Sequence, residues 1–105
     1  MEESEFNRLA AEAMATIEAG LEASDADLDF ELAAGGILEI EFADGSKIIV
    51  NKHGVAREIW VAAKAGGFHF RWSGSDWVDT RDGSELMQKL SMLASQQAGE
   101  PVSLR

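Results

Sequence analysis

The sequence predicts an α+β domain in which two terminal helices pack on one face of a six-stranded antiparallel sheet, as an α-β sandwich. Helical periodicity near both chain ends, apolar/polar alternation between them, and connections too short for parallel crossovers predict this class. The 105 residues suffice for one hydrophobic core and not for two, so residues 1–105 are expected to form a single domain. Two end helices can cover only one face of such a sheet, which leaves the other face open.

Apolar residues at steps of three and four predict the two helices. The first extends from Ser4 to about Ala23, with an apolar stripe of Phe6, Leu9, Ala10, Ala13, Ile17 and Leu21. The second carries Leu86, Leu90, Leu93 and Gln97. We expect Ser84 to be its N-cap and the helix to end near Gly99 and Pro101.

Period-two alternation predicts the strands between the helices, at residues 27–32, 38–42, 47–51, 58–63, 68–72 and 76–80. Asp44-Gly45 separates the second strand from the third and favours a type I′ hairpin turn, which needs positive φ at both central residues. His53 is expected in a loop. Short glycine-containing loops join the remaining strands as antiparallel neighbours.

The net charge of −10 is concentrated in the first part of the chain. Residues 1–44 contain thirteen acidic residues and one basic residue, whereas the remainder contains six acidic and eight basic residues. Such a segment repels nucleic acid and acidic membranes and attracts cations and basic proteins. We therefore expect neither nucleic acid nor a membrane as a partner.

The location expected from the sequence is the cytoplasm. The chain has no cysteine, its start is acidic where a signal peptide would be basic, and no apolar run is long enough to span a membrane. It also lacks zinc-ligand spacing, an EF-hand loop, a phosphate loop and a nucleophile elbow. These observations favour a binding protein over an enzyme.

Alternation along the strands indicates which side chains the open face carries. Its acidic half should hold Asp27, Asp29, Glu31, Glu39 and Glu41, joined from the first helix and its end by Glu18, Glu22 and Asp25. Carboxylates on neighbouring strands repel one another and oppose folding, which favours cation binding over the alternative of a merely solubilising surface. Strand positions i and i+2 lie about 7 Å apart, so weak, exchangeable sites for hard cations are expected. Glu39, Glu41 and His69 are candidate auxiliary ligands, with a plain exposed strand histidine as the alternative for His69.

The other half of the open face should be basic, aromatic and amide-bearing: Lys47, Asn51, Trp60, His69 and Arg71. An outward tryptophan leaves apolar surface in water and is a common anchor of protein interfaces. A strand register shifted by one residue, which would place Trp60 in the core, is the alternative.

Several segments resemble the bacterial frataxin (CyaY) family. They are Asp44–Asn51 (DGSKIIVN), Glu58–Lys64 (EIWVAAK), Gly66–Phe70 (GGFHF), the opening Ser4-Glu5-Phe6, and the closing Gln96–Glu100 with Val102-Ser103. The similarity spans the whole chain. Two departures are an acidic ridge shorter by a residue or two and Lys52-His53 where the family usually has Gln and Pro.

The resemblance implies the frataxin fold and a role in iron–sulfur cluster assembly. It implies weak binding of Fe²⁺ or Fe³⁺, with other divalent cations possible, at an acidic ridge, here Glu18, Glu22, Asp25, Asp27, Asp29 and Glu31. The implied partners are a cysteine desulfurase and the scaffold protein, the latter facing Asn51 and Trp60. We expect a monomer without iron, with metal-driven oligomers possible.

Three functions remain open from the sequence. The first is a regulatory adaptor whose ridge docks on the desulfurase while bound iron tunes sulfur delivery. The second is an iron chaperone or store with weak ferroxidase activity. The third is an acidic protein that blocks a basic site and needs no metal.

Overall fold

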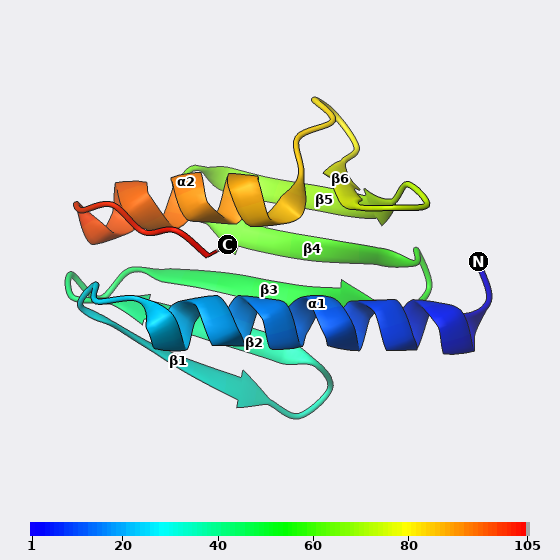
Figure 1. The fold of residues 1–105 in the computed structure, drawn as a ribbon, viewed down its shortest axis with the longest axis horizontal. Coiled ribbons are helices and arrows are strands. Elements are labelled where there is room, and N and C mark those ends of the chain that lie inside the picture. Colours follow the sequence, from blue (N-terminus) through cyan, green and yellow to red (C-terminus); the bar gives the residue numbers. More distant parts are fainter. Residues whose placement is uncertain (105) are drawn as a thin grey trace.

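The computed structural model describes residues 1–104, and its elements follow the predicted order (Figure 1). Two helices flank six strands: α1 (Glu3–Ala23), β1 (Leu28–Ala33), β2 (Ile37–Phe42), β3 (Lys47–His53), β4 (Glu58–Ala63), β5 (Gly66–Trp72), β6 (Trp77–Asp79) and α2 (Leu86–Ala98). All neighbouring strands are antiparallel and the strand order is β1-β2-β3-β4-β5-β6. The predicted α+β class is confirmed.

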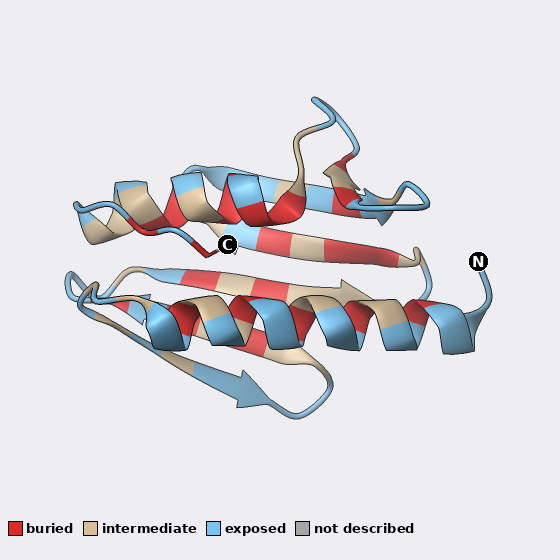
Figure 2. Ribbon diagram, viewed as in Figure 1, coloured by how far each residue is buried: buried red, intermediate tan, exposed pale blue. Residues whose placement is uncertain are grey.

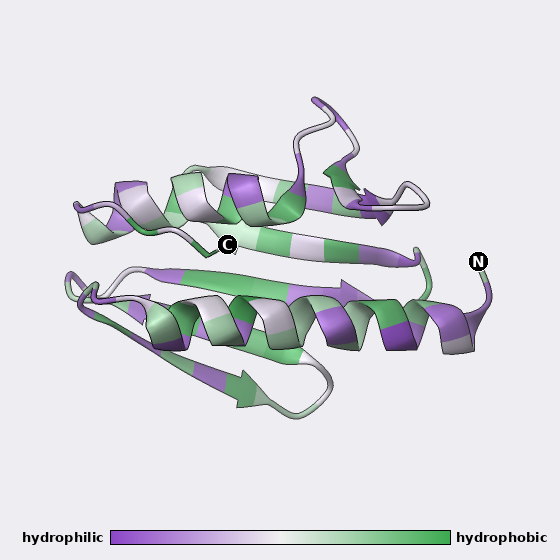
Figure 3. Ribbon diagram, viewed as in Figure 1, coloured by the Kyte–Doolittle hydropathy of each residue, from purple (hydrophilic) through white to green (hydrophobic). Residues whose placement is uncertain are grey.

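Both helices lie on the same face of the sheet, and the core fills the space between the two layers (Figures 1 and 2). Hydrophilic and hydrophobic residues lie side by side along α1, as an amphipathic helix requires (Figure 3). The buried residues of α1 are Phe6, Ala10, Met14, Ile17 and Leu21. They pack in one cluster with alternate residues of the sheet, Leu38, Ile40, Phe42, Ile48, Val50, Ile59, Val61 and Phe70. Among residues 1–104, no helix covers the opposite face of the sheet (Figure 1).

Two local predictions were wrong. The N-cap of α2 is Glu85 and not Ser84, because the Glu85 carboxylate accepts hydrogen bonds from the amides of Met87 and Gln88. The Ser84 hydroxyl instead donates to Asp82. The β2–β3 loop is not a type I′ turn: Gly45 has a φ of 84° and is the loop's one positive-φ residue, and its N–H donates to Phe42. This pattern is typical of a three-residue hairpin loop in which glycine supplies the left-handed position.

Strand ends also differ from the predicted bounds. β3 continues through His53, which was expected in a loop, because residues 51–53 pair with residues 58–60 of β4. β5 begins at Gly66, and β6 is only three residues long. Leu32 of β1 is 49 % exposed, since β1 is an edge strand and its end lies at the border of the sheet (Figure 2).

The C-terminal tail, residues 100–104, returns between the two helices (Figure 1). The amide of Val102 donates to the Ser95 hydroxyl, and the amide of Leu104 donates to the Ser91 hydroxyl. Val102 and Leu104 are both buried. Gly20 of α1 faces this tail so closely that an added Cβ would lie 2.5 Å from the carbonyl oxygen of Leu104. The tail therefore joins α1 to α2.

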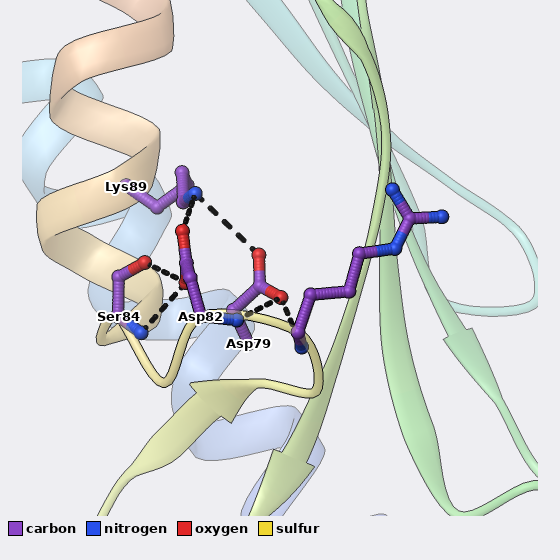
Figure 4. Close-up of polar contacts among 5 residues, drawn as sticks. Asp79, Asp82, Ser84 and Lys89 are labelled. Atoms are coloured by element: carbon purple, nitrogen blue, oxygen red, sulfur yellow. Dashed lines mark hydrogen bonds and ion pairs between the residues drawn. The ribbon is translucent and has the colours of Figure 1, made fainter.

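A buried lysine ties the β6–α2 connection to α2 (Figure 4). Lys89 is 9 % exposed, and its Nζ lies 2.8 Å from Asp82 Oδ2 and 3.5 Å from Asp79 Oδ2. The hydrogen bond to Asp82, with the charges of both carboxylates, raises the pKa of Lys89 above its usual value. The same bond, with others from Ser84, lowers the pKa of Asp82. The lysine is thus held in its charged form.

Neither α1 nor α2, the helices within residues 1–104, is long and apolar enough to cross a membrane.

Candidate metal-binding and docking surfaces

The register of β1 and β2 places four carboxylates together on the open face of the sheet. Asp29 lies directly opposite Glu41, and Glu31 directly opposite Glu39. These four side chains line one shallow hollow with part of Phe30. Directly opposed like charges repel one another, so this arrangement destabilises the folded chain. We call these four residues the acidic patch.

Within residues 1–104, one member of the acidic patch forms an ion pair: Glu39, whose Oε1 lies 2.7 Å from Lys47 Nζ. Glu41 lies directly opposite the same lysine across the strands. The hydrogen bond that Lys47 donates to Glu39 and the charge of Glu39, with a smaller contribution from the charge of Glu41, raise the pKa of Lys47. Asp29, Glu31 and Glu41 form no ion pair with a described residue. Most of the patch charge is therefore left for an external cation or a basic partner.

The remaining predicted metal ligands lie along the chain before β1. Glu18 and Glu22 are on the last two turns of α1, and Asp25 and Asp27 are in the loop that follows. The amide of Asp27 donates to Glu100, and none of these four carboxylates forms an ion pair within the described residues. No three acidic or histidine side chains of residues 1–104 gather closely enough to hold a metal ion. The structure therefore spreads these carboxylates along an edge and does not converge them on one point.

His69 does not join the acidic patch. It lies on β5, three strands from β2, which at ordinary strand spacing is about 14 Å away. Its ring stacks on Trp60.

The second surface is built around Trp60 on β4. Its neighbours Ile59 and Val61 are buried in the core, so Trp60 lies on the open face, and the predicted outward orientation is confirmed. Cross-strand pairing places Asn51 on one side of it and His69 on the other. The imidazole of His53 also stacks on the indole, with ring centroids 3.8 Å apart.

Glu58 is buried beneath this surface although its alternation places it on the open face. One carboxylate oxygen accepts a 2.8 Å hydrogen bond from Trp60 Nε1, and the other lies 2.6 Å from Arg71 Nη2. Burial by itself raises the pKa of Glu58, but the hydrogen bonds from Trp60 and Arg71, with the charge of Arg71, outweigh it and lower the pKa. Glu58 therefore stays ionised beside the indole.

Glu58 and His53 also belong to this surface, although neither was predicted as a member of it from the sequence. The signal for Glu58 was available, because positions 58 and 60 of one strand share a face. His53 was missed because the length of β3 was underestimated, and its side chain acquires its place only through pairing with β4. Predicted partner residues Asn51, Trp60 and Arg71 do lie together here, while Lys47 lies toward the acidic patch.

The chain is thus a small α-β sandwich of two terminal helices on a six-stranded meander, with acidic residues along one edge of the sheet. Residues 1–100 match a family model described as a frataxin-like domain. The chain belongs to this frataxin-like family.

Relatives and solved structures agree with this membership. The chain is 72 % identical over 105 residues to the iron-sulfur cluster assembly protein CyaY of Dechloromonas aromatica, covering 100 % of both chains. It is 53 % identical to the protein of the same name from Cupriavidus metallidurans, covering 100 % of this chain and 97 % of the relative. A solved frataxin from Psychromonas ingrahamii superposes with a TM-score of 0.92 at 31 % identity, covering 100 % of this chain and 99 % of the other.

Proposed function

We propose that this chain is a regulatory adaptor of iron–sulfur cluster assembly and has no catalytic centre of its own. Its role in that process follows from its relatives, which are named iron-sulfur cluster assembly proteins. Its acidic ridge (Glu18, Glu22, Asp25, Asp27, Asp29 and Glu31) docks on a basic surface of the cysteine desulfurase. The open face around Asn51 and Trp60 docks on the scaffold protein.

The observation that carries the proposal is the set of carboxylates that form no ion pair at one edge of the sheet. Asp29, Glu31 and Glu41 repel one another in the free protein and have no ion pair within residues 1–104. A basic partner surface relieves that repulsion and speeds association through long-range attraction. The docking is therefore sensitive to salt.

Iron is the cargo that the same edge binds, weakly and with exchange. Carboxylate oxygens suit Fe²⁺, Fe³⁺ and other hard cations. Because no three described ligands converge, much of the coordination shell is left to water. Such binding favours an adaptor that responds to iron over a store with a built ferroxidase centre. Oxygen consumption by the isolated chain with Fe²⁺ would favour the store instead.

The affinity for the desulfurase tests the proposed adaptor function. Replacing Asp25, Asp27 and Asp29 by Asn and Glu31 by Gln is expected to weaken binding about 10- to 100-fold at low salt, because several charge pairs are lost together. Calorimetric titration of purified desulfurase measures the affinity. The matched control replaces Glu2, Glu3, Glu5 and Asp76 by their amides, which changes the net charge equally away from the ridge. Equal weakening by both variants would show that only net charge matters, and unchanged binding by the ridge variant would refute the proposal.

The stability of the free protein tests the repulsion itself. The double variant Asp29→Asn/Glu31→Gln is expected to raise the melting temperature by about 2–8 °C, because two opposed like-charge pairs are relieved. Mn²⁺, as a hard cation, should raise the melting temperature of the wild type more than that of the variant. The control is Glu3→Gln/Glu5→Gln in the first turn of α1. Acidic side chains there interact favourably with the helix dipole, so their replacement should not raise the melting temperature. A lower melting temperature for Asp29→Asn/Glu31→Gln than for the wild type would mean that these two carboxylates stabilise the fold.

A further inference from the structure

The indole of Trp60 is enclosed between two imidazoles. His53 on β3 stacks at a centroid distance of 3.8 Å and an interplanar angle of 12°, and His69 on β5 stacks at 4.3 Å and 7°. Because β4 lies between β3 and β5, the two imidazoles cover opposite faces of the indole. Neither flat face of the ring is free to receive a planar group from a partner.

The rings of this stack are held in place by further hydrogen bonds. The Nδ1 atom of His53 accepts from the amide of Ala56 at 3.2 Å. The indole N–H donates to Glu58, which is only 5 % exposed and is itself paired with Arg71. His69 Nδ1 lies 3.7 Å from the same Glu58 oxygen. The orientation of Trp60 is therefore fixed before any partner arrives.

What remains of Trp60 for a partner is the carbon edge of its ring. Both faces are covered and the N–H is already used. A shallow hollow borders this edge, and its walls include Ile49, Ala62, Gly67 and the side of Asn51. His69 also lines the hollow, so its polar side-chain groups are the Asn51 amide and the His69 imidazole; against the remaining, apolar walls a polar group would lose water without gaining a side-chain hydrogen bond.

We propose that His53, His69 and Glu58 are positioning residues that present Trp60 edge-on, and that the hollow beside it receives an aliphatic side chain of the docked protein. This inference rests on the proposed function, because it concerns the surface assigned to the scaffold protein. In this arrangement the amide of Asn51, which lines the hollow, bonds the backbone next to that aliphatic side chain. Ordering of the indole in the free protein lowers the entropy lost on docking.

The first measurement concerns the free protein. In protein labelled with 5-fluorotryptophan, the ¹⁹F signal of Trp60 is assigned by its loss in Trp60→Phe. His53→Leu and His69→Leu, which remove the stacking rings, and Glu58→Gln, which keeps the hydrogen-bond acceptor but removes the charge, are compared with the wild type. We expect the two leucine variants to shift or broaden the Trp60 signal while Trp72 and Trp77 are unmoved, and His53→Phe, which restores a ring, to reverse the effect.

The second measurement is the affinity for the purified scaffold protein. His53→Leu is expected to weaken binding by up to about tenfold through lost ordering, with His53→Phe close to the wild type. In Glu58→Gln a small effect is expected, because the acceptor is kept, whereas Glu58→Leu should match His53→Leu.

Four outcomes separate the possibilities. The expected ¹⁹F and affinity changes together support the proposal. An unchanged Trp60 signal in both leucine variants overturns it, as does full scaffold affinity in His53→Leu when Trp60→Ala loses binding. If Trp60→Ala itself binds the scaffold normally, the proposed function is wrong at this surface, and the docking inference falls with it.

Discussion

Replacing Lys89 by Met is expected to lower the free energy of unfolding by about 3 kcal/mol. Asp79 is 4 % exposed, and without Lys89 its buried carboxylate loses its cationic partner. The amide of Arg81 still donates to Asp79, which limits the loss. Urea unfolding followed by circular dichroism measures the change. The cation also lies 4.9 Å from the centre of the Phe68 ring, a contact that methionine keeps only as packing.

Two further variants separate the buried charge from the loss of a lysine. Lys64→Met changes an exposed lysine and should alter stability by less than about 0.5 kcal/mol. In the double variant Asp79→Asn/Lys89→Met the uncompensated charge is gone, so the loss should be smaller than for Lys89→Met alone. A double variant that is at least as unstable as the sum of the single ones would contradict this account.

Replacing Gly20 by Ala is expected to destabilise the protein by about 2 kcal/mol, although the same change inside a helix ordinarily stabilises. The new Cβ would lie 2.5 Å from the carbonyl oxygen and 2.8 Å from the Cα of Leu104. These are backbone atoms, so the tail must move, and the buried side chain of Leu104 loses its place in the core. Thermal and urea unfolding measure the loss.

The control for Gly20 is a chain that ends at Pro101. With the tail absent, Gly20→Ala should become stabilising by up to about 1 kcal/mol, because only the helix preference of alanine remains. The change of sign identifies the tail contact as the cause. A substitution that destabilises both chains equally would place the effect elsewhere.

Most of the fold could be predicted from the sequence because its elements have strong periodic patterns. The stripe of Phe6, Ala10 and Ile17 identifies α1, and the alternation around Ile40 and Val50 identifies the sheet. The ends of elements were less certain. By residue type Ser84 is a preferred cap and Glu85 is not, and only the hydrogen bonds that Glu85 accepts from the amides of α2 identify it as the cap.

The candidate site was predictable where it depends on alternation and not where it depends on contacts between strands. Alternation alone placed Asp29, Glu31, Glu39 and Glu41 on one face, and the register confirms that they meet. The enclosure of Trp60 by His53 depends on the length of β3. The burial of Glu58 depends on Arg71, thirteen residues away, so no local pattern reveals it.

The linear strand order has a consequence for how the chain folds. Every strand pairs only with its neighbours in sequence, so each hairpin can form through short loops at a low cost in chain entropy. Within residues 1–104 the two ends of the chain meet where the tail packs against α1 and in contacts such as that between Asp27 and Glu100, 73 residues apart. Bringing the two ends together closes a loop that spans most of the chain, and this is entropically the most expensive step of folding. We therefore expect the folded protein to open first at its two termini.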